Sequence, residues 1–103
     1  MNETILNPTP QQLEEWTKKY GKVNEFESAD GKKCWLAKPS RDVIRAANVA
    51  GGDDSIKWNE VLLKNIFLAG DPCFITDDEY FFGLTKELGD LVPKKLVELK
   101  KTY

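Results

Sequence analysis

The stretch Lys22–Lys38, with the sequence KVNEFESADGKKCWLAK, decides the fold class of this 103-residue chain. Asp30-Gly31 separates two short runs of strand-forming residues. Asp-Gly in this position predicts a β-hairpin, because both central residues of such a turn tolerate a positive φ. A two-stranded hairpin is marginally stable in water, so we expect it to pack on the rest of the chain through Phe26 and Trp35.

A helix is predicted on the N-terminal side of the hairpin. Thr9 is followed three residues later by Gln12, which is the pattern of a capping box. Apolar residues then recur at helical spacing until Gly21, a typical helix C-terminal residue. Residues 1–8 precede this helix as a frayed arm.

Two further helices are predicted after the hairpin. Ser40 is a suitable N-cap for the first, and Gly51-Gly52 ends it. The second, Ile56–Ala69, has apolar residues around most of its circumference. Such a helix is either the central core helix, or core on one side and a partner surface on the other.

The last part of the chain is predicted to be one long helix. Thr76 begins a capping box, and an apolar stripe then continues in steps of three or four residues to Leu99. The stripe passes through Pro93, whose ring clashes with the carbonyl four residues earlier. We therefore expect a kink near Gly89–Pro93, or two helices with Asp90 as the second cap.

These patterns together predict a mostly helical α+β fold. The chain is expected to form a single domain over residues 1–103, with the hairpin at 22–38 and a helical body at 40–103. A long C-terminal helix, kinked near its middle, completes the body.

The composition argues against several classes of function. With 15 basic and 17 acidic residues the net charge is 15 − 17 = −2, without the basic excess expected of a nucleic-acid binder. Histidine, the commonest general base and metal ligand, is absent. The acidic clusters at Asp53-Asp54 and Asp77–Glu79 precede predicted helices, where capping accounts for them. We expect no catalytic residue, no cofactor, no metal site and no enzymatic activity.

The sequence predicts a cytoplasmic protein. No apolar run approaches the ~20 residues that span a bilayer, and the N-terminus does not resemble a signal peptide. Cys34 and Cys73 are interpreted as reduced, buried thiols of a cytoplasmic protein. We therefore expect neither membrane association nor a disulfide.

The aromatic residues suggest a protein-binding surface. Tyr80, Phe81 and Phe82 are consecutive, so on a helix at about 100° per residue they cannot all face one core. Exposed aromatic side chains are typical of protein–protein contacts, although a wide core face is an equal alternative. The candidate contact residues are Phe67, Leu68, Phe74, Tyr80 and Phe82, together with the basic Lys38 and Arg41.

Four segments resemble small tail assembly chaperones of long-tailed bacteriophages and prophages. They are Leu36–Arg41 (LAKPSR), Ile56–Leu63 (IKWNEVLL), Leu68–Asp71 (LAGD) and Leu96–Lys101 (LVELKK), the last at the end of an acidic-capped helix. The resemblance covers residues 22–101. Trp58, Pro93 and the N-terminal helix have no counterpart in that pattern.

The resemblance implies a non-enzymatic role in the host cytoplasm. Such chaperones coat the aggregation-prone helices of a tape measure protein until tail tube protein displaces them. Two alternatives remain: a self-assembling structural protein that forms a homo-oligomer through the C-terminal stripe, and a small nucleic-acid-binding regulator.

Overall fold

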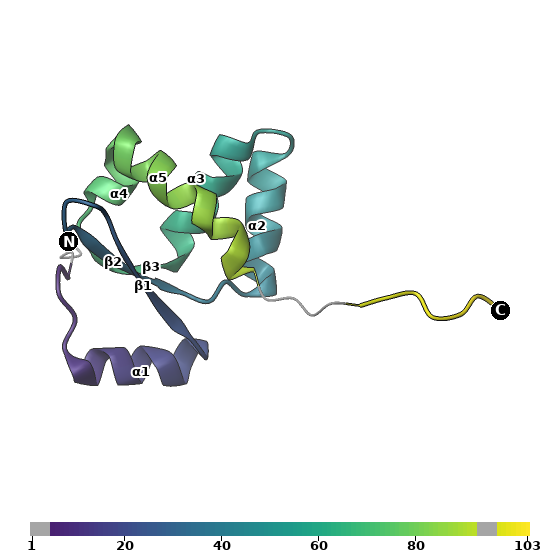
Figure 1. Cartoon of the computed structure of the whole chain (residues 1–103), viewed down its shortest axis with the longest axis horizontal. Helices are drawn as coiled ribbons and strands as arrows, with labels where there is room; N and C mark the ends of the chain where they lie inside the picture. The colour runs from purple at the N-terminus through teal and green to yellow at the C-terminus, as the bar shows by residue number, and fades with distance from the viewer. Residues whose placement is uncertain (1–4, 93–96) are drawn as a thin grey trace.

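The computed structural model describes residues 5–92 and 97–103, and in it a three-stranded antiparallel sheet carries helices on both sides (Figure 1). A mostly helical α+β fold is therefore confirmed. In chain order the elements are α1 (Pro10–Tyr20), β1 (Val23–Glu27), β2 (Lys33–Ala37), α2 (Arg41–Gly51), α3 (Ser55–Ile66), β3 (Phe67–Gly70), α4 (Cys73–Thr76), α5 (Asp78–Leu88) and the 3₁₀ turn η1 (Gly89–Leu91).

The predicted first helix and hairpin are both confirmed. The Gln12 amide donates to Thr9 Oγ1 at 3.1 Å and the Thr9 amide donates to Gln12 Oε1 at 2.9 Å, which completes the capping box at the start of α1. β1 and β2 pair with Phe26 opposite Cys34, and Gly31 adopts the positive φ of 87° that the turn requires. Interactions between residues close in the sequence therefore determine α1 and the β1–β2 hairpin.

The end of the predicted helix Ile56–Ala69 is wrong. Helix α3 stops at Ile66, and Phe67–Gly70 forms β3, which pairs with β2 as the third strand of the sheet. A short apolar run fits a helix or a buried strand equally well, so pairing with β2 determines its conformation. Phe67 and Leu68 consequently belong to the sheet and are half-buried there.

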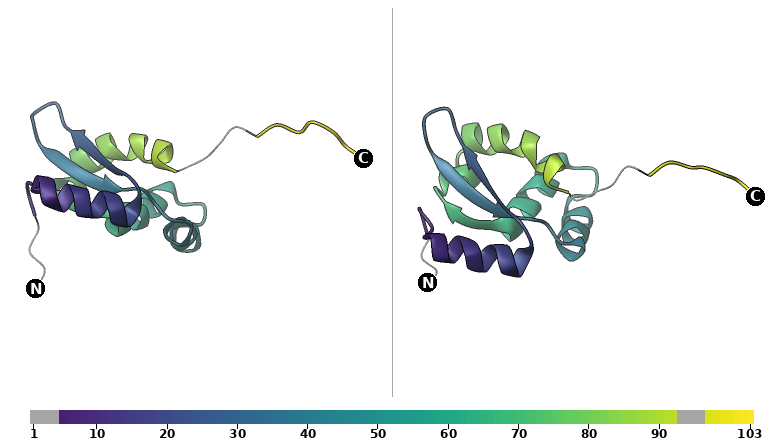
Figure 2. Two further views of the ribbon diagram at one scale, coloured as in Figure 1. Left: turned by 90° about the horizontal axis from the view of Figure 1, so that it is seen from below. Right: turned by 60° about the horizontal axis from the view of Figure 1, so that its bottom comes forward.

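The main core lies between the sheet and the helices that follow it. Leu36 of β2, Leu62 and Leu63 of α3 and Leu88 of α5 are fully buried in one cluster. Helix α1 lies on the other side of the sheet, as the views in Figure 2 show. The sheet is thereby covered on both faces, and α5 runs above the hairpin (Figure 1).

Helices α2 and α3 pack closely against each other. A Cβ added to Gly51 would lie 2.8 Å from the Cα of Trp58, so the glycine permits the close approach. The Trp58 Nε1–H donates to Asn48 Oδ1 at 2.6 Å across the same contact. Gly51, the last residue of α2, thus permits close packing, and Gly52 reverses the chain with a φ of 53°.

The predicted long C-terminal helix is wrong in its extent. Helix α5 ends at Leu88, η1 continues to Leu91, and Val97–Tyr103 has no regular secondary structure. Pro93, the expected site of a kink, lies outside the described residues. Beyond η1, Val92 is half-buried, whereas Val97 and Leu99 are exposed.

In the described ranges 5–92 and 97–103, no helix has the length and apolar character needed to cross a membrane.

Candidate functional site

A groove of about 630 Å³ lies where the hairpin turn meets α5, and we call it the turn groove. Its apolar lining comes from Phe26 of β1, Phe74 of α4, and Tyr80 and Leu84 of α5. Gly83 and the turn residues 27–30 complete the lining, with Glu79, Lys86 and Glu87 along α5. Its volume is in the range of clefts that take up ligands or partner side chains.

The floor of the turn groove is held in place by aromatic packing. The rings of Phe74 and Tyr80 make an edge-to-face contact with their centroids 5.7 Å apart. Phe74 is 3% exposed, so it supports the floor, whereas Tyr80 and Phe26 are half-buried and accessible. The groove therefore presents aromatic surface on a rigid base.

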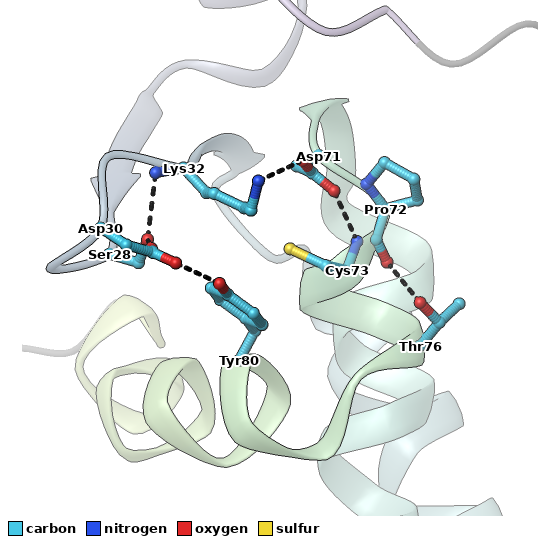
Figure 3. Close-up of polar contacts among 8 residues, drawn as sticks. All are labelled: Ser28, Asp30, Lys32, Asp71, Pro72, Cys73, Thr76 and Tyr80. Atoms are coloured by element: carbon cyan, nitrogen blue, oxygen red, sulfur yellow. Dashed lines mark hydrogen bonds and ion pairs between the residues drawn. The ribbon is translucent and has the colours of Figure 1, made fainter.

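A polar latch joins the hairpin turn to α5 (Figure 3). The hydroxyls of Ser28 and Tyr80 each donate a hydrogen bond to the Asp30 carboxylate, and the Lys32 amide donates to Ser28 Oγ at 3.0 Å. The bonds from Ser28 and Tyr80 lower the pKa of Asp30. The bond to Asp30 raises the pKa of Tyr80 to about 12, so this hydroxyl keeps its proton at neutral pH.

Asp71 fixes the start of α4 against the same turn (Figure 3). Its carboxylate accepts the Cys73 amide at 3.0 Å and lies 3.6 Å from Lys32 Nζ. The hydrogen bond from the Cys73 amide is the main cause that lowers the pKa of Asp71. Helix α4, which carries Phe74, is thereby held at a constant distance from the hairpin.

Gly83 contributes no side chain to the middle of the α5 wall of the groove. It lies inside α5, where glycine is about 1 kcal/mol less favourable than alanine. A Cβ added there meets no atom within 4 Å, so close helix packing does not explain the glycine. The missing side chain leaves room along the α5 wall of the groove.

The rim of the groove is acidic. Glu79 and Glu87 lie four residues to either side of Gly83 on α5, and Glu27 and Asp30 lie across from them on the hairpin. Lys86 is the one basic residue among the lining residues. Among residues 5–92 and 97–103, none of these four carboxylates has a Lys or Arg nitrogen within 4.0 Å. The rim is therefore open to a basic partner.

A smaller hollow of about 300 Å³ lies on the other side of α5, against α3. Ile56 and Phe82 line it and are 47% and 51% exposed. Its charged lining is mixed, with Glu60, Lys64 and Asp78. It is a second apolar patch with fewer acidic residues than the turn groove has.

The structure separates the seven predicted contact residues. It brings Tyr80 and Phe74 together at the turn groove, but Phe74 is buried and, as placed, is core instead of contact surface. Phe82 lies at the smaller hollow. Of the other four, Phe67 and Leu68 are half-buried in β3, and Lys38 and Arg41 are exposed at the start of α2, outside both hollows.

Sequence reasoning missed the residues that make the groove acidic and open. Phe26 was expected as a hairpin contact, but the hairpin–α5 junction that places it at the groove is a long-range contact without a local signal. Gly83 did carry a signal, because a glycine inside an amphipathic helix is unfavourable without a packing or binding reason.

Neither cysteine has the character of a reactive thiol. Cys34 is fully buried, Cys73 is half-buried, and they form no disulfide. Burial raises the pKa of Cys34 to about 12, and burial with the nearby Asp71 raises that of Cys73 to about 11. Within the described part of the chain, no three Cys, Asp or Glu side chains are grouped to hold a metal ion.

Comparisons with known proteins give no relative for this chain. No protein-family model, no curated protein and no solved structure matches it. The functional argument therefore depends on the groove itself.

Proposed function

We propose that this protein is a non-enzymatic chaperone of bacteriophage or prophage tail assembly, which shields an apolar helical segment of a tape measure protein in the turn groove. The groove joins an accessible aromatic floor to an acidic rim, which suits an amphipathic helix with apolar side chains on one face and basic ones at its border. The resemblance of residues 22–101 to tail assembly chaperones supplies the class of partner. Such binding takes place in the host cytoplasm.

Gly83 is the observation that carries this proposal. The glycine makes α5 less stable than alanine would, and among residues 5–92 and 97–103 no atom lies within 4 Å of a Cβ added there. A glycine that lowers the stability of the helix but leaves space on its surface is expected where a partner approaches closely. The hydrogen bond from the Tyr80 hydroxyl to the Asp30 carboxylate joins the two walls of the groove and fixes their relative position.

Co-expression with helical fragments of the tape measure protein encoded in the same genome tests the proposal. We expect the wild-type chain to keep such a fragment soluble and to co-purify with it. Gly83→Trp fills the groove with an indole and should reduce the captured fragment by at least about tenfold, as loss of a central contact site does.

Gly89→Trp is the matched control, because Gly89 is also exposed, lies just beyond α5 and has no atom within 4 Å of an added Cβ. It should capture the fragment like the wild type. Equal capture by both tryptophan variants and the wild type would exclude the turn groove as the binding site.

A further inference from the structure

The outer edge of the sheet at β1 carries backbone groups that the sheet leaves unpaired. The strand order is β1-β2-β3, so β1 has a neighbouring strand on one side only. At one end of β1 the Lys38 amide donates to the Lys22 carbonyl at 3.0 Å. At the other end the Ser28 amide donates to the Lys32 carbonyl at 2.8 Å. Lys22 and Ser28 therefore both direct backbone groups towards the β2 side.

The alternation of an antiparallel ladder then identifies the outward-facing residues. Along each strand, residues that bond to the neighbouring strand alternate with residues that do not. Because Lys22 and Ser28 bond to that side, Val23, Glu25 and Glu27 direct their N–H and C=O groups away from β2. Among residues 5–92 and 97–103, no backbone group bonds to these three residues on their outer side. The edge of β1 is thus open to an extended chain that adds as a further strand.

The side chains on one face of this edge are acidic. Glu25 and Glu27 share that face, are exposed, and are accompanied by no basic residue within β1. Glu25 Oε2 lies 3.9 Å from Lys33 Nζ, but both side chains are partly exposed, and such pairs contribute little. In the described ranges, Glu27 has no Lys or Arg nitrogen within 4.0 Å. A strand with basic residues opposite the two glutamates is therefore favoured over an acidic one.

The other face of the same edge is apolar. Phe26 is half-buried, packs against the core and lines the turn groove. Glu27 lines the groove as well, although its side chain alternates to the opposite face from that of Phe26, so the groove reaches the outer edge of β1. Residues of an added strand that point to this face would meet Phe26 beside the groove. Apolar residues suit these positions.

We propose that the outer edge of β1 binds an extended segment of a partner protein in which basic residues alternate with apolar ones. The segment adds as an antiparallel strand, with its basic residues opposite Glu25 and Glu27 and its apolar residues beside Phe26. A second copy of this chain does not fit, because antiparallel pairing of two β1 strands over their full length places Glu25 opposite Glu25. The acidic edge therefore disfavours self-association and selects a basic strand.

Amide hydrogen exchange by NMR, with the full chain titrated by a synthetic peptide, tests the proposal. The peptide has seven residues that alternate lysine and valine, and concentrations up to about 2 mM cover the weak affinity of so small a contact. In the free protein, the amides of Val23, Glu25 and Glu27 should exchange rapidly. Those of Asn24 and Phe26, which bond to β2, should exchange slowly. At a peptide concentration of about ten times Kd, the three outward amides should exchange about tenfold more slowly than without peptide.

Methyl groups on the peptide backbone provide a matched pair of controls. Lysines opposite Glu25 and Glu27 direct their N–H groups towards β1, because opposite residues in these positions form hydrogen-bonded pairs. N-methylation of the lysines should therefore abolish binding. N-methylation of the valines, whose N–H groups face away from β1, should leave the peptide bound. Equal binding or equal loss for the two methylated peptides overturns the proposal.

Charge reversal on the protein tests the selection of a basic strand. Glu25→Lys with Glu27→Lys should weaken binding of the lysine–valine peptide about tenfold and should allow a glutamate–valine peptide to bind. Glu14→Lys with Glu15→Lys changes two exposed residues of α1 and alters the net charge equally, so it should bind the lysine–valine peptide like the wild type. Equal weakening by both variants overturns the assignment to β1. Should the first variant unfold, Glu25→Gln with Glu27→Gln replaces it and must also weaken binding.

Two further results would overturn the proposal. The first is outward amides of β1 that stay unprotected at the highest peptide concentration, or that already exchange slowly in the free monomer. The second is a wild-type dimer in sedimentation whose formation protects the same amides, because the occupant of the edge would then be a second copy.

The inference goes beyond the proposed function, since peptide binding at the edge needs no tape measure protein. The two are separated by comparing peptide binding with capture of the tape measure fragment by the same wild-type chain. Capture without protection of the β1 amides by the peptide overturns the edge proposal alone. Peptide binding without capture overturns the tape measure proposal alone.

Discussion

A few single side chains fix the hairpin turn relative to α5 at the turn groove. Asp30 lies at the tip of the hairpin and accepts hydrogen bonds from Ser28, its neighbour in the turn, and from Tyr80, fifty residues further along the chain. The first bond shapes the turn and the second fixes the distance between the turn and α5. Both bonds are stronger to the ionised carboxylate, which is why they lower the pKa of Asp30.

The latch predicts a loss of stability in acid. The pKa of Asp30 is lower in the folded protein than its ordinary value of 3.8, so its contribution to stability is present above about pH 4. This contribution is lost as the pH falls through the lowered value in the folded state. Urea unfolding between pH 5 and pH 2 should therefore show a smaller pH dependence for Ser28→Ala and for Tyr80→Phe than for the wild type. An unchanged acid dependence in both variants would contradict the latch.

Tyr80 contributes in the opposite direction at high pH. Its pKa is raised from 10.0 to about 12 by the bond to Asp30, so its contribution is complete below pH 10 and is lost as the pH rises through about 12. Absorbance titration of the phenolic groups should show one tyrosine that ionises late. Asp30→Asn should return the pKa of Tyr80 towards its ordinary value of 10.0, and a late tyrosine in that variant would exclude the assignment.

Gly70 illustrates a residue whose backbone determines the sheet. Its φ is 124°, and an added Cβ would collide with backbone atoms of Lys33 and Cys34 in β2. Gly70→Ala should destabilise the fold by more than the about 1–3 kcal/mol typical of backbone strain alone, because it adds a collision. Gly31→Ala, with φ 87° and open space, is the control and should cost about 1 kcal/mol. If urea unfolding showed the same loss of stability for Gly70→Ala and Gly31→Ala, β3 would not approach β2 as closely as the structure describes.

At the scale of the elements, two helical glycines are predicted to respond in opposite ways to alanine. Gly83→Ala should stabilise the protein by about 1 kcal/mol, because alanine favours the helix and meets nothing. Gly51→Ala should destabilise it by about 1–3 kcal/mol, because its Cβ would press on the backbone of Trp58. Chemical denaturation of the two variants measures both changes. The same sign for both would show that the contact between α2 and α3 is looser than the structure describes.

The elements also show what the sequence could predict. The start of α1, the hairpin and the cap of α2 each depend on a few neighbouring residues, such as Thr9 with Gln12 or Asp30 with Gly31, and all are confirmed. The conversion of Phe67–Gly70 to a strand depends on β2, more than thirty residues away. The end of α5 at Leu88 likewise contradicts a periodicity that continues to Leu99, because apolar spacing alone does not supply a core to pack on.

The groove itself could be predicted only in part. Tyr80 was identified because three consecutive aromatic residues cannot share one face, and the structure places it in the groove. The acidic rim combines residues from the hairpin and α5, which are distant in the sequence. Lys38 and Arg41 were selected by charge alone, and they lie at the start of α2 away from the groove.

At the scale of the whole molecule, two apolar hollows lie on either side of α5. The turn groove is larger and has four acidic lining residues and one basic one, whereas the hollow beside Phe82 is smaller and has two acidic lining residues and one basic one. The larger excess of acidic residues gives the turn groove the stronger electrostatic preference for a basic partner, in addition to apolar contact. The body acts as a scaffold that presents this groove between the hairpin and α5.

Amide chemical-shift mapping by NMR, with the full chain titrated by a basic helical fragment of the tape measure protein, tests this assignment most directly. We predict that the shifts concentrate in residues 26–30 and 79–87, on the two walls of the turn groove. Shifts that concentrate around Phe82 and Ile56, or at Lys38 and Arg41, or that are absent at saturating fragment, would contradict it.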